Sequence, residues 1–351
     1  MRRNNPRVLL VPFGYPDYPI ELLHRFLQMS RDMLTGMNLE VGELSPILVW
    51  RDVAPAVEKI RCSDHDALVA LLLSWVEAPN VVATLRDFFH QPILLWAHTP
   101  FMENGERLTM GALPAAGVIR ETLEEMEANF KFVFGLPDDA WVRREVESYA
   151  RASFAFSRLR EAKIGLLGYA SMGMYTGTFD HVKVRKELGP EIEHLDQYVL
   201  VRKIEASDVR TAQEMALQVA KEWNVSEGIE SDDLTWVFRV FLALREIVTE
   251  GGYDAITVKC QYELSRLYGF APCVPLSILG DHMTVSCEGD VLLLLSQLVL
   301  HYLTGRVTTY GDVHDVVDNG IIVGACGFAP LSLTVSPPII HRHSAPVSYT
   351  H

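Results

Sequence analysis

The sequence predicts an α/β protein with two successive domains, each built on a parallel sheet. In residues 1–140, short apolar segments alternate with segments whose apolar residues recur at helical spacing. The same alternation resumes after residue 163, beyond a long charged helical pattern. Strands that alternate with helices form parallel sheets with helices on both faces. The apolar run within residues 66–76 supports this prediction, because a strand covered on both faces has no polar side.

The first expected domain, residues 1–140, contains several strands and helices. The strands are expected where short apolar runs end at glycine, proline or polar residues: 7–13, 66–76, 92–97 and 132–135. The helices are expected where apolar residues recur every three to four positions: 20–34, 80–89 and 122–130. This order places helices between consecutive strands, as a parallel sheet requires.

The second expected domain, residues 163–333, follows a connecting helix at residues 141–162. Its expected strands are 163–168 and 255–260, and its helical patterns are 208–223 and 232–249, the first with an N-cap at Ser207 or Asp208. The apolar run at 291–300 has about half the length that a membrane span needs, so we expect a buried helix there.

Composition narrows the functional classes. The chain has 351 residues and a formal net charge of -14, which disfavours binding to nucleic acid but suits a small, nearly neutral ligand and a bound cation. Its five cysteines are widely spaced, which argues against a disulfide framework and for a reducing cytoplasm. The apolar stretch near the N-terminus is too short for a signal peptide. We therefore expect a cytoplasmic protein with no membrane partner.

A glycine-rich segment follows the strand expected at residues 163–168. Gly165, Gly168, Gly173 and Gly177 would let a ligand approach the backbone closely. Their spacing is not that of a dinucleotide-binding loop. A tight strand-to-helix turn is the alternative interpretation of the same glycines.

Two carboxylates suggest a site for a divalent cation. Glu288 precedes the apolar helix and Asp312 follows it, 24 residues later. A helix of fifteen residues covers about 22 Å, so the return loop can bring the two side chains together. Mn²⁺ and Mg²⁺ favour such oxygen ligands. The alternatives are solvated or helix-capping carboxylates, and Asp290 competes for the role because it lies at the N-terminus of the helix.

Several segments of the second half together resemble the L-fucose isomerase family. They are residues 168–175, 178–180, 287–290, 301–305 and 312–313. The resemblance implies successive α/β domains, the start of a C-terminal barrel-like domain, and Mn²⁺-dependent interconversion of an aldose and a ketose. It implies that Glu288 and Asp312 bind the metal and act as acid and base, and that Gln261 contacts the monosaccharide substrate. It also implies a homo-oligomer when the protein is full length.

The C-terminal end departs from this resemblance. The family supplies a further histidine ligand from its final domain, and we expect this chain to be truncated before that point. Residues 334–351 are expected to be a non-native or disordered tail, although His341, His343 and His351 could in principle supply the ligand. Truncation could leave the isomerase inactive.

Two other functions stay open from the sequence. A non-catalytic sugar-binding protein also has two α/β domains, although such proteins carry a signal peptide. A nucleotide-dependent enzyme would use the glycines at 165–177, although their spacing does not match the usual motif. Dependence on Mn²⁺ would distinguish an isomerase from both.

Overall fold

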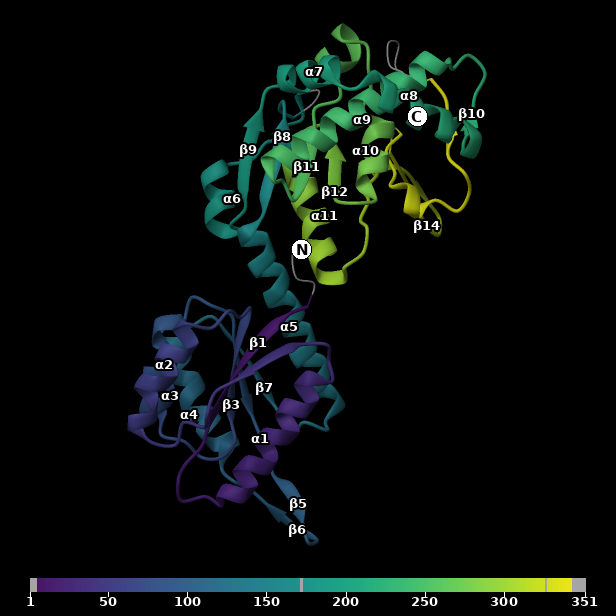
Figure 1. The fold of residues 1–351 in the computed structure, drawn as a ribbon. Helices are drawn as coiled ribbons and strands as arrows, with labels where there is room; N and C mark the ends of the chain where they lie inside the picture. Colours follow the sequence, from purple (N-terminus) through teal and green to yellow (C-terminus); the bar gives the residue numbers. More distant parts are fainter. Residues whose placement is uncertain (1–4, 171–172, 326, 343–351) are drawn as a thin grey trace. The chain divides into compact units, whose positions relative to one another are not determined.

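The computed structural model describes residues 5–170, 173–325 and 327–342 (Figure 1). The chain divides into two compact units, Met1–Ser157 and Arg158–His351. Each unit has its own parallel sheet, which confirms the predicted α/β class. The division falls within the helix α5 (Ala140–Glu161), where the sequence predicts a connecting helix.

The first unit contains a five-stranded parallel sheet in the order β2-β1-β3-β4-β7. Its strands are β1 (Arg7–Phe13), β2 (Glu40–Glu43), β3 (Ala67–Leu72), β4 (Ile93–Ala97) and β7 (Phe130–Phe134). All six residues of β3 are buried, as the unbroken apolar run predicts. A short hairpin, β5 (Phe101–Glu103) and β6 (Glu106–Leu108), follows β4.

Helices cover both faces of this sheet. They are α1 (Ile20–Thr35), α2 (Val53–Arg61), α3 (Ala78–Leu85), α4 (Ala112–Glu125) and α5. Alternate residues of β1 point to opposite faces: Val8 packs in the core formed with α1 and α5, and Leu9 packs in the core formed with α2, α3 and α4. This alternation explains why the strands are apolar on both sides.

One predicted helix is displaced along the chain. The sequence predicts residues 122–130, whereas α4 spans Ala112–Glu125. The helix begins directly after Gly111, whose φ of 78° suits glycine, and the chain turns at Glu127, whose φ is 55°. Phe130 then begins β7, so its apolar side chain belongs to the sheet rather than to the helix.

The second unit contains a four-stranded parallel sheet in the order β12-β11-β8-β9. Its strands are β8 (Lys163–Leu167), β9 (Glu191–Leu195), β11 (Ala255–Val258) and β12 (Thr284–Cys287). The chain adds β9 on one side of β8 and then β11 on the other. The order of connection therefore reverses between β8 and β11.

The helices of the second unit also form two layers. They are α6 (His181–Glu187), α7 (Gln197–Ala206), α8 (Val209–Glu222), α9 (Ser231–Gly251), α10 (Cys273–Gly280) and α11 (Val291–Thr304). Buried residues of α7, α8, α9 and α10 belong to one hydrophobic core. Buried residues of α6 and α11 belong to a second hydrophobic core. The apolar run at 291–300 is part of α11, but this helix is buried on one face only, because Leu292 and Leu300 are exposed. Among the described residues, none of the helices combines the length and the apolar composition that a membrane span requires.

Small strands follow α11. β13 (Asp312–Val317) and β14 (Gly320–Gly324) form an exposed antiparallel hairpin, and β15 (Ile339–Ile340) pairs with β10 (Asn224–Val225). The described sheets do not close into a barrel. Of the tail expected at 334–351, residues 334–342 are described and Ile340 is buried, while 343–351 lie outside the described residues.

Candidate active site

The carboxyl ends of the four parallel strands in the second unit meet at one edge of the sheet. Polar or flexible residues follow each strand end: Gly168 after β8, Asp196 after β9, Lys259 after β11 and Glu288 after β12. In open α/β sheets, ligands bind at this edge. The edge therefore forms the candidate site, and Glu288 lies at it; the predicted role of Glu288 in binding and catalysis stays a prediction.

Glu288 is held in an unusual backbone conformation. Its φ is 68°, in the left-handed region that residues with a side chain seldom adopt. Gly289 follows with a φ of 69°, and a Cβ atom on Gly289 would lie 2.1 Å from the carbonyl oxygen of Tyr169. Such conformations cost about 1–3 kcal/mol and cluster at functional sites. Close packing on Tyr169 thus fixes the turn that presents Glu288.

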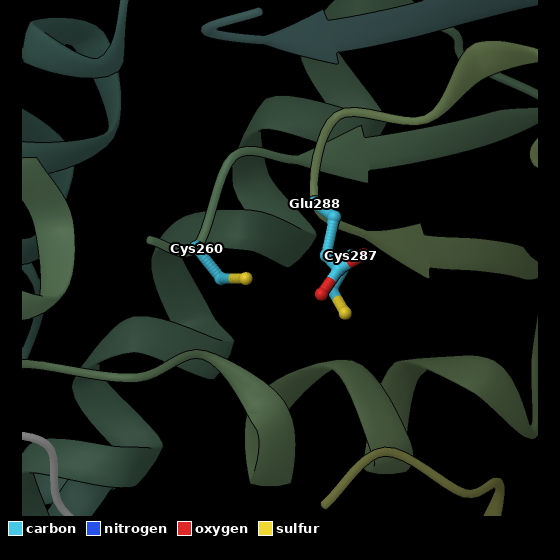
Figure 2. A group of neighbouring side chains, drawn as sticks. All are labelled: Cys260, Cys287 and Glu288. Atoms are coloured by element: carbon cyan, nitrogen blue, oxygen red, sulfur yellow. The ribbon is translucent and has the colours of Figure 1, made fainter. Parts of the chain in front are cut away.

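Two thiols lie beside the Glu288 carboxylate. The Sγ atoms of Cys260 and Cys287 and a carboxylate oxygen of Glu288 lie within 4.8 Å of one another. Figure 2 shows Cys260, after β11, pointing toward the two side chains at the end of β12. Both cysteines are buried, and Glu288 is half-buried. None of the four described cysteines forms a disulfide.

Tyr310, in the segment after α11, contacts the cluster through Cys287. Its hydroxyl lies 2.5 Å from the Sγ of Cys287, and its ring stacks on Phe328 at 5.2 Å between centroids. Burial, reinforced by the neighbouring Cys287 thiol, raises the pKa of the Tyr310 phenol. Tyr310 is therefore a neutral hydrogen-bonding partner of the cluster at physiological pH.

The other predicted site residues lie in different surroundings. Asp312 is exposed at the start of β13 and does not belong to the described group of potential ligands around Glu288. Gln261 is half-buried and directly follows Cys260. Gln261 therefore lies beside a member of the cluster in the sequence, and its contact with the substrate stays a prediction, as does the pairing of Glu288 with Asp312.

The competing carboxylate, Asp290, has a structural role. Its Oδ1 accepts a hydrogen bond of 2.9 Å from the backbone N–H of Leu293, which caps the N-terminus of α11. His301, at the other end of this helix, places its Nδ1 2.8 Å from the carbonyl oxygen of Arg306. Asp290 is thus a helix-capping carboxylate, and the contact of His301 links the end of the helix to the segment that follows it.

The described donors do not fit Mn²⁺. Around Glu288 the described cysteine, histidine, aspartate and glutamate donors comprise two thiols and one carboxylate. Thiols favour softer ions, whereas Mn²⁺ favours carboxylate, carbonyl and water oxygens. Of the tail histidines, His341 places its Nδ1 3.0 Å from the carbonyl of Arg342, and His343 and His351 lie outside the described residues.

The glycine-rich segment forms a turn at the same edge. Gly168 has a φ of 95°, and a Cβ atom there would lie 2.9 Å from the Cβ of Lys259. Gly177 packs near Ala170 and Asp290, and Thr178 leads to α6. Residues 171 and 172 lie outside the described residues. The segment thus contains the strand-to-helix turn of the alternative interpretation, and it also borders the candidate site.

Sequence reasoning missed a buried lysine at this edge. Lys259 has a fully buried side chain that pairs with Glu263 and lies 3.6 Å from the centroid of the Tyr169 ring. A lysine directly after an apolar strand was the available signal, since buried lysines are rare unless paired.

Comparison with known proteins connects this chain to sugar isomerases. It is 24% identical over 337 residues to a sulfoquinovose isomerase of Clostridium sp. (strain MSTE9), a match that covers 93% of this chain and 73% of the relative. It is also 25% identical to a sulfoquinovose isomerase of Priestia aryabhattai, a match that covers 94% of this chain and 74% of the relative. A sulfoquinovose isomerase of Alkalicoccus urumqiensis is likewise 25% identical, over 95% of this chain and 76% of the relative.

Other comparisons add no functional information. No family model matches the chain. A solute-binding protein of an ABC transporter from Burkholderia multivorans aligns with a TM-score of 0.22 at 10% identity, over 87% of this chain and 95% of that protein. A TM-score this low carries no argument. The chain is therefore a homologue of sugar isomerases, and its resemblance to L-fucose isomerases in particular is not established.

Proposed function

We propose that this protein is an aldose–ketose isomerase that moves a proton between C1 and C2 of an open-chain monosaccharide. The observation that carries the proposal is the similarity to several sulfoquinovose isomerases over 93–95% of the chain. The carboxylate of Glu288, presented at the ligand-binding edge of a parallel sheet, supplies a group suited to this chemistry.

The proposed reaction needs one base beside the sugar. The Glu288 carboxylate takes the proton from C2 of the aldose while a solvent water molecule gives a proton to O1, which yields an enediol and hydroxide. The same carboxyl group then returns a proton to C1 while O2 gives its proton to that hydroxide, which yields the ketose and restores the water molecule. A positioned general acid–base group contributes about 10²–10⁴-fold to such a rate. The left-handed backbone at Glu288 and its contact through Gly289 support the fixed position that this role needs.

The substrate proposal follows the relatives. Sulfoquinovose, a sulfonated hexose, is the substrate in the names of the proteins matched. The sequence resemblance implies a monosaccharide without selecting one, and L-fucose and L-arabinose are among the sugars that fit it. We propose sulfoquinovose as the first substrate to test, with L-fucose as the second.

Dependence on Mn²⁺ remains a prediction. A bound divalent cation would polarise O1 and O2 of the sugar. Because the described donors around Glu288 are mostly thiols, we derive no step that requires the ion. Activity measured after dialysis against EDTA, with and without added Mn²⁺, tests the prediction directly. Unchanged activity after dialysis would contradict it.

The decisive experiment follows each sugar by NMR in D₂O with the full chain. We expect a ketose to form with one of the two sugars, with solvent deuterium appearing at C1 of the ketose, because a proton held by a carboxyl group exchanges with solvent. Ketose formation without deuterium would refute proton transfer through Glu288. Failure to convert either sugar, with and without Mn²⁺, would refute the proposed activity on these substrates.

A further inference from the structure

A pocket of about 390 Å³ opens at the carboxyl edge of the sheet in the second unit. Its walls come from the turn after β8, the end of β9 and the segment after β11. The polar groups that line it are Tyr169, His194, Asp196, Gln197 and Glu263. Its volume lies within the range of about 300–1,000 Å³ that is usual for sites that bind small molecules.

The pocket lies beside the point where the strand order reverses. The chain places β9 on one side of β8 and β11 on the other, so the order of connection reverses between the ends of β8 and β11. Ligands of open α/β sheets bind at such a reversal. Tyr169 comes from the segment after β8 and Glu263 from the segment after β11, so the pocket has lining residues from both strands at the reversal.

Lys259 forms the buried support of the pocket. Its side chain is 0% exposed, and its Nζ pairs with a carboxylate oxygen of Glu263. The same Nζ lies 3.6 Å from the centroid of the Tyr169 ring. A buried ammonium group is unfavourable unless it is paired, and both partners satisfy that need.

The two partners of Lys259 remain open to solvent. Tyr169 is 60% exposed, and the side chain of Glu263 is 50% exposed. Hydrogen bonding to Lys259 holds the pKa of Glu263 below its ordinary value. Burial by itself lowers the pKa of Lys259, but the bonds to Glu263 and Tyr169 outweigh burial and raise it. Both members of the pair are therefore charged at neutral pH.

The backbone around Glu263 also favours a fixed position. Tyr262 has a φ of 70°, unusual for a residue with a side chain, and a short π-helical turn, Glu263–Leu267, begins directly after it. The side-chain amide of Gln197 donates a hydrogen bond to the carbonyl oxygen of Lys259. This bond ties the end of β9 to the end of β11.

We propose that this pocket binds the hydroxyl-bearing carbons of a monosaccharide, with Tyr169 as its apolar wall and Glu263 as a hydrogen-bond acceptor, both positioned by Lys259. The inference rests on the proposed function, because it names the part of the sugar that lies away from the reacting carbons. Lys259 itself is a positioning residue, since its side chain has no exposed surface.

The lining favours a neutral polyhydroxylated segment over an anionic group. Carboxylates such as Glu263 and Asp196 accept hydrogen bonds from hydroxyl groups, and the face of a tyrosine ring packs against sugar C–H groups. The same two carboxylates repel a sulfonate, and the charge of Lys259 is balanced by Glu263. A sulfonated sugar would therefore place its hydroxyl groups, not its sulfonate, in this pocket.

The test measures binding of sulfoquinovose and L-fucose to the full chain by isothermal titration calorimetry. We expect Tyr169→Ala and Glu263→Gln each to weaken binding at least tenfold. The matched control is Tyr198→Ala, because Tyr198 is 65% exposed on α7 and does not line the pocket. It should change Kd less than twofold.

Lys259→Met tests the positioning role separately. In the isomerase assay we expect KM to rise at least tenfold while kcat changes less than threefold, because the reacting carbons lie at Glu288. A variant that was merely misfolded would lose kcat together with its circular dichroism spectrum. Should Lys259→Met fail to fold, the Tyr169 and Glu263 variants still decide the inference.

The outcomes separate this inference from the proposed function. If the wild-type protein isomerises a sugar and the Tyr169 and Glu263 variants bind it equally well, the inference is wrong and the isomerase proposal stands. If binding depends on Tyr169 but no sugar is isomerised, the pocket is supported and the isomerase proposal fails. Absence of binding by the wild-type protein, or equal losses in Tyr169→Ala and Tyr198→Ala, would overturn the inference.

Discussion

The two units have the same architecture but different chemistry at the carboxyl edges of their sheets. Both sheets are parallel, both have helices on two faces, and in both the strand order reverses once, between β1 and β3 in the first unit and between β8 and β11 in the second. Architecture alone would therefore give each unit a place for a ligand. The difference lies in which side chains follow the strands.

The buried polar groups Ser74 and His98 at the described edge of the first unit are neutral. The backbone N–H of Tyr15 donates a hydrogen bond of 3.0 Å to Oγ of the buried Ser74. His98, after β4, is buried against Trp96 and Phe26, and its Nε2 lies 3.0 Å from Oγ of Ser30. Burial lowers the pKa of His98 to about 3, so its imidazole is neutral at physiological pH.

Charged and reactive groups gather at the edge of the second unit. Lys259 pairs with Glu263, and Glu288 lies beside two thiols. Both Tyr262 and Glu288 have positive φ values, so the turns after β11 and β12 are strained in the same way. The comparison teaches that a fold offers a site but that residues at the strand ends decide its chemistry.

The largest expected effect tests this contrast through two glutamates. Glu288 and Glu127, one in each unit, both have positive φ. Glu288→Gln should lower kcat about 10²–10⁴-fold, because an amide cannot act as the base. Glu127→Gln, in an exposed turn after α4, should leave kcat within twofold. Steady-state kinetics on the isomerised sugar provide the measurement, and equal activity of the two variants would remove Glu288 from the mechanism.

The next effect compares two glycines. Gly289→Ala should destabilise the second unit by about 3 kcal/mol, because the new methyl group meets the Tyr169 carbonyl and the backbone is left-handed. Gly105, in the hairpin of the first unit, has a φ of 83°, but a Cβ atom there would meet no atom within 4 Å. Gly105→Ala should therefore lower the stability of the first unit by only about 1 kcal/mol. Urea denaturation measures both. Equal losses of stability in the two variants would mean that the protein relieves the contact with the Tyr169 carbonyl at no cost in free energy.

Much of the fold could be predicted from the sequence because apolar periodicity is a local signal. The strands at Arg7–Phe13 and Ala67–Leu72 and the helix Val291–Thr304 are confirmed at or near the predicted bounds. The order of strands within each sheet could not be predicted, because pairing depends on contacts between distant segments. The displaced helix α4 shows a second limit, since Phe130 has the same apolar signal in a strand as in a helix.

The site was predictable only in part, for a related reason. Glu288 is recognisable by its place before an apolar helix, and the resemblance reinforces it. The pairing with Asp312 stays a prediction, because it depends on the path of the chain after α11, where Asp312 begins an exposed hairpin. The approach of Cys260 to Cys287 and of Lys259 to Tyr169 depends on strand order, so no spacing in the sequence reveals it.

The neutral edge of the first unit predicts a pH dependence of stability. The pKa of His98 is lowered from 6.5 in the unfolded chain to about 3 in the folded unit, so below pH 6.5 the unfolded chain binds the proton more tightly. The contribution of neutral His98 to the free energy of unfolding is complete above pH 6.5 and is lost as the pH decreases toward 3. Between pH 6.5 and 5.0 the loss should be about 1.5 kcal/mol.

His98→Gln removes this titration. Between pH 6.5 and 5.0, the free energy of unfolding of the variant should fall by about 1.5 kcal/mol less than that of the wild-type protein. Urea denaturation at the two pH values measures this difference. His24→Gln is the matched control, because His24 is exposed, and it should retain the wild-type dependence. The same slope in all three proteins would show that His98 is accessible to protons in the folded unit.

The smallest effect separates capping from catalysis at Asp290. Asp290→Ala should destabilise the second unit by about 1 kcal/mol, because the N–H of Leu293 loses its acceptor. Asp290→Asn should keep most of that stability, since asparagine caps helices nearly as well. Both variants should retain kcat. If Asp290→Asn lost activity as severely as Glu288→Gln, then the edge of the second unit would use two carboxylates, and Asp290 rather than Asp312 would be the partner of Glu288.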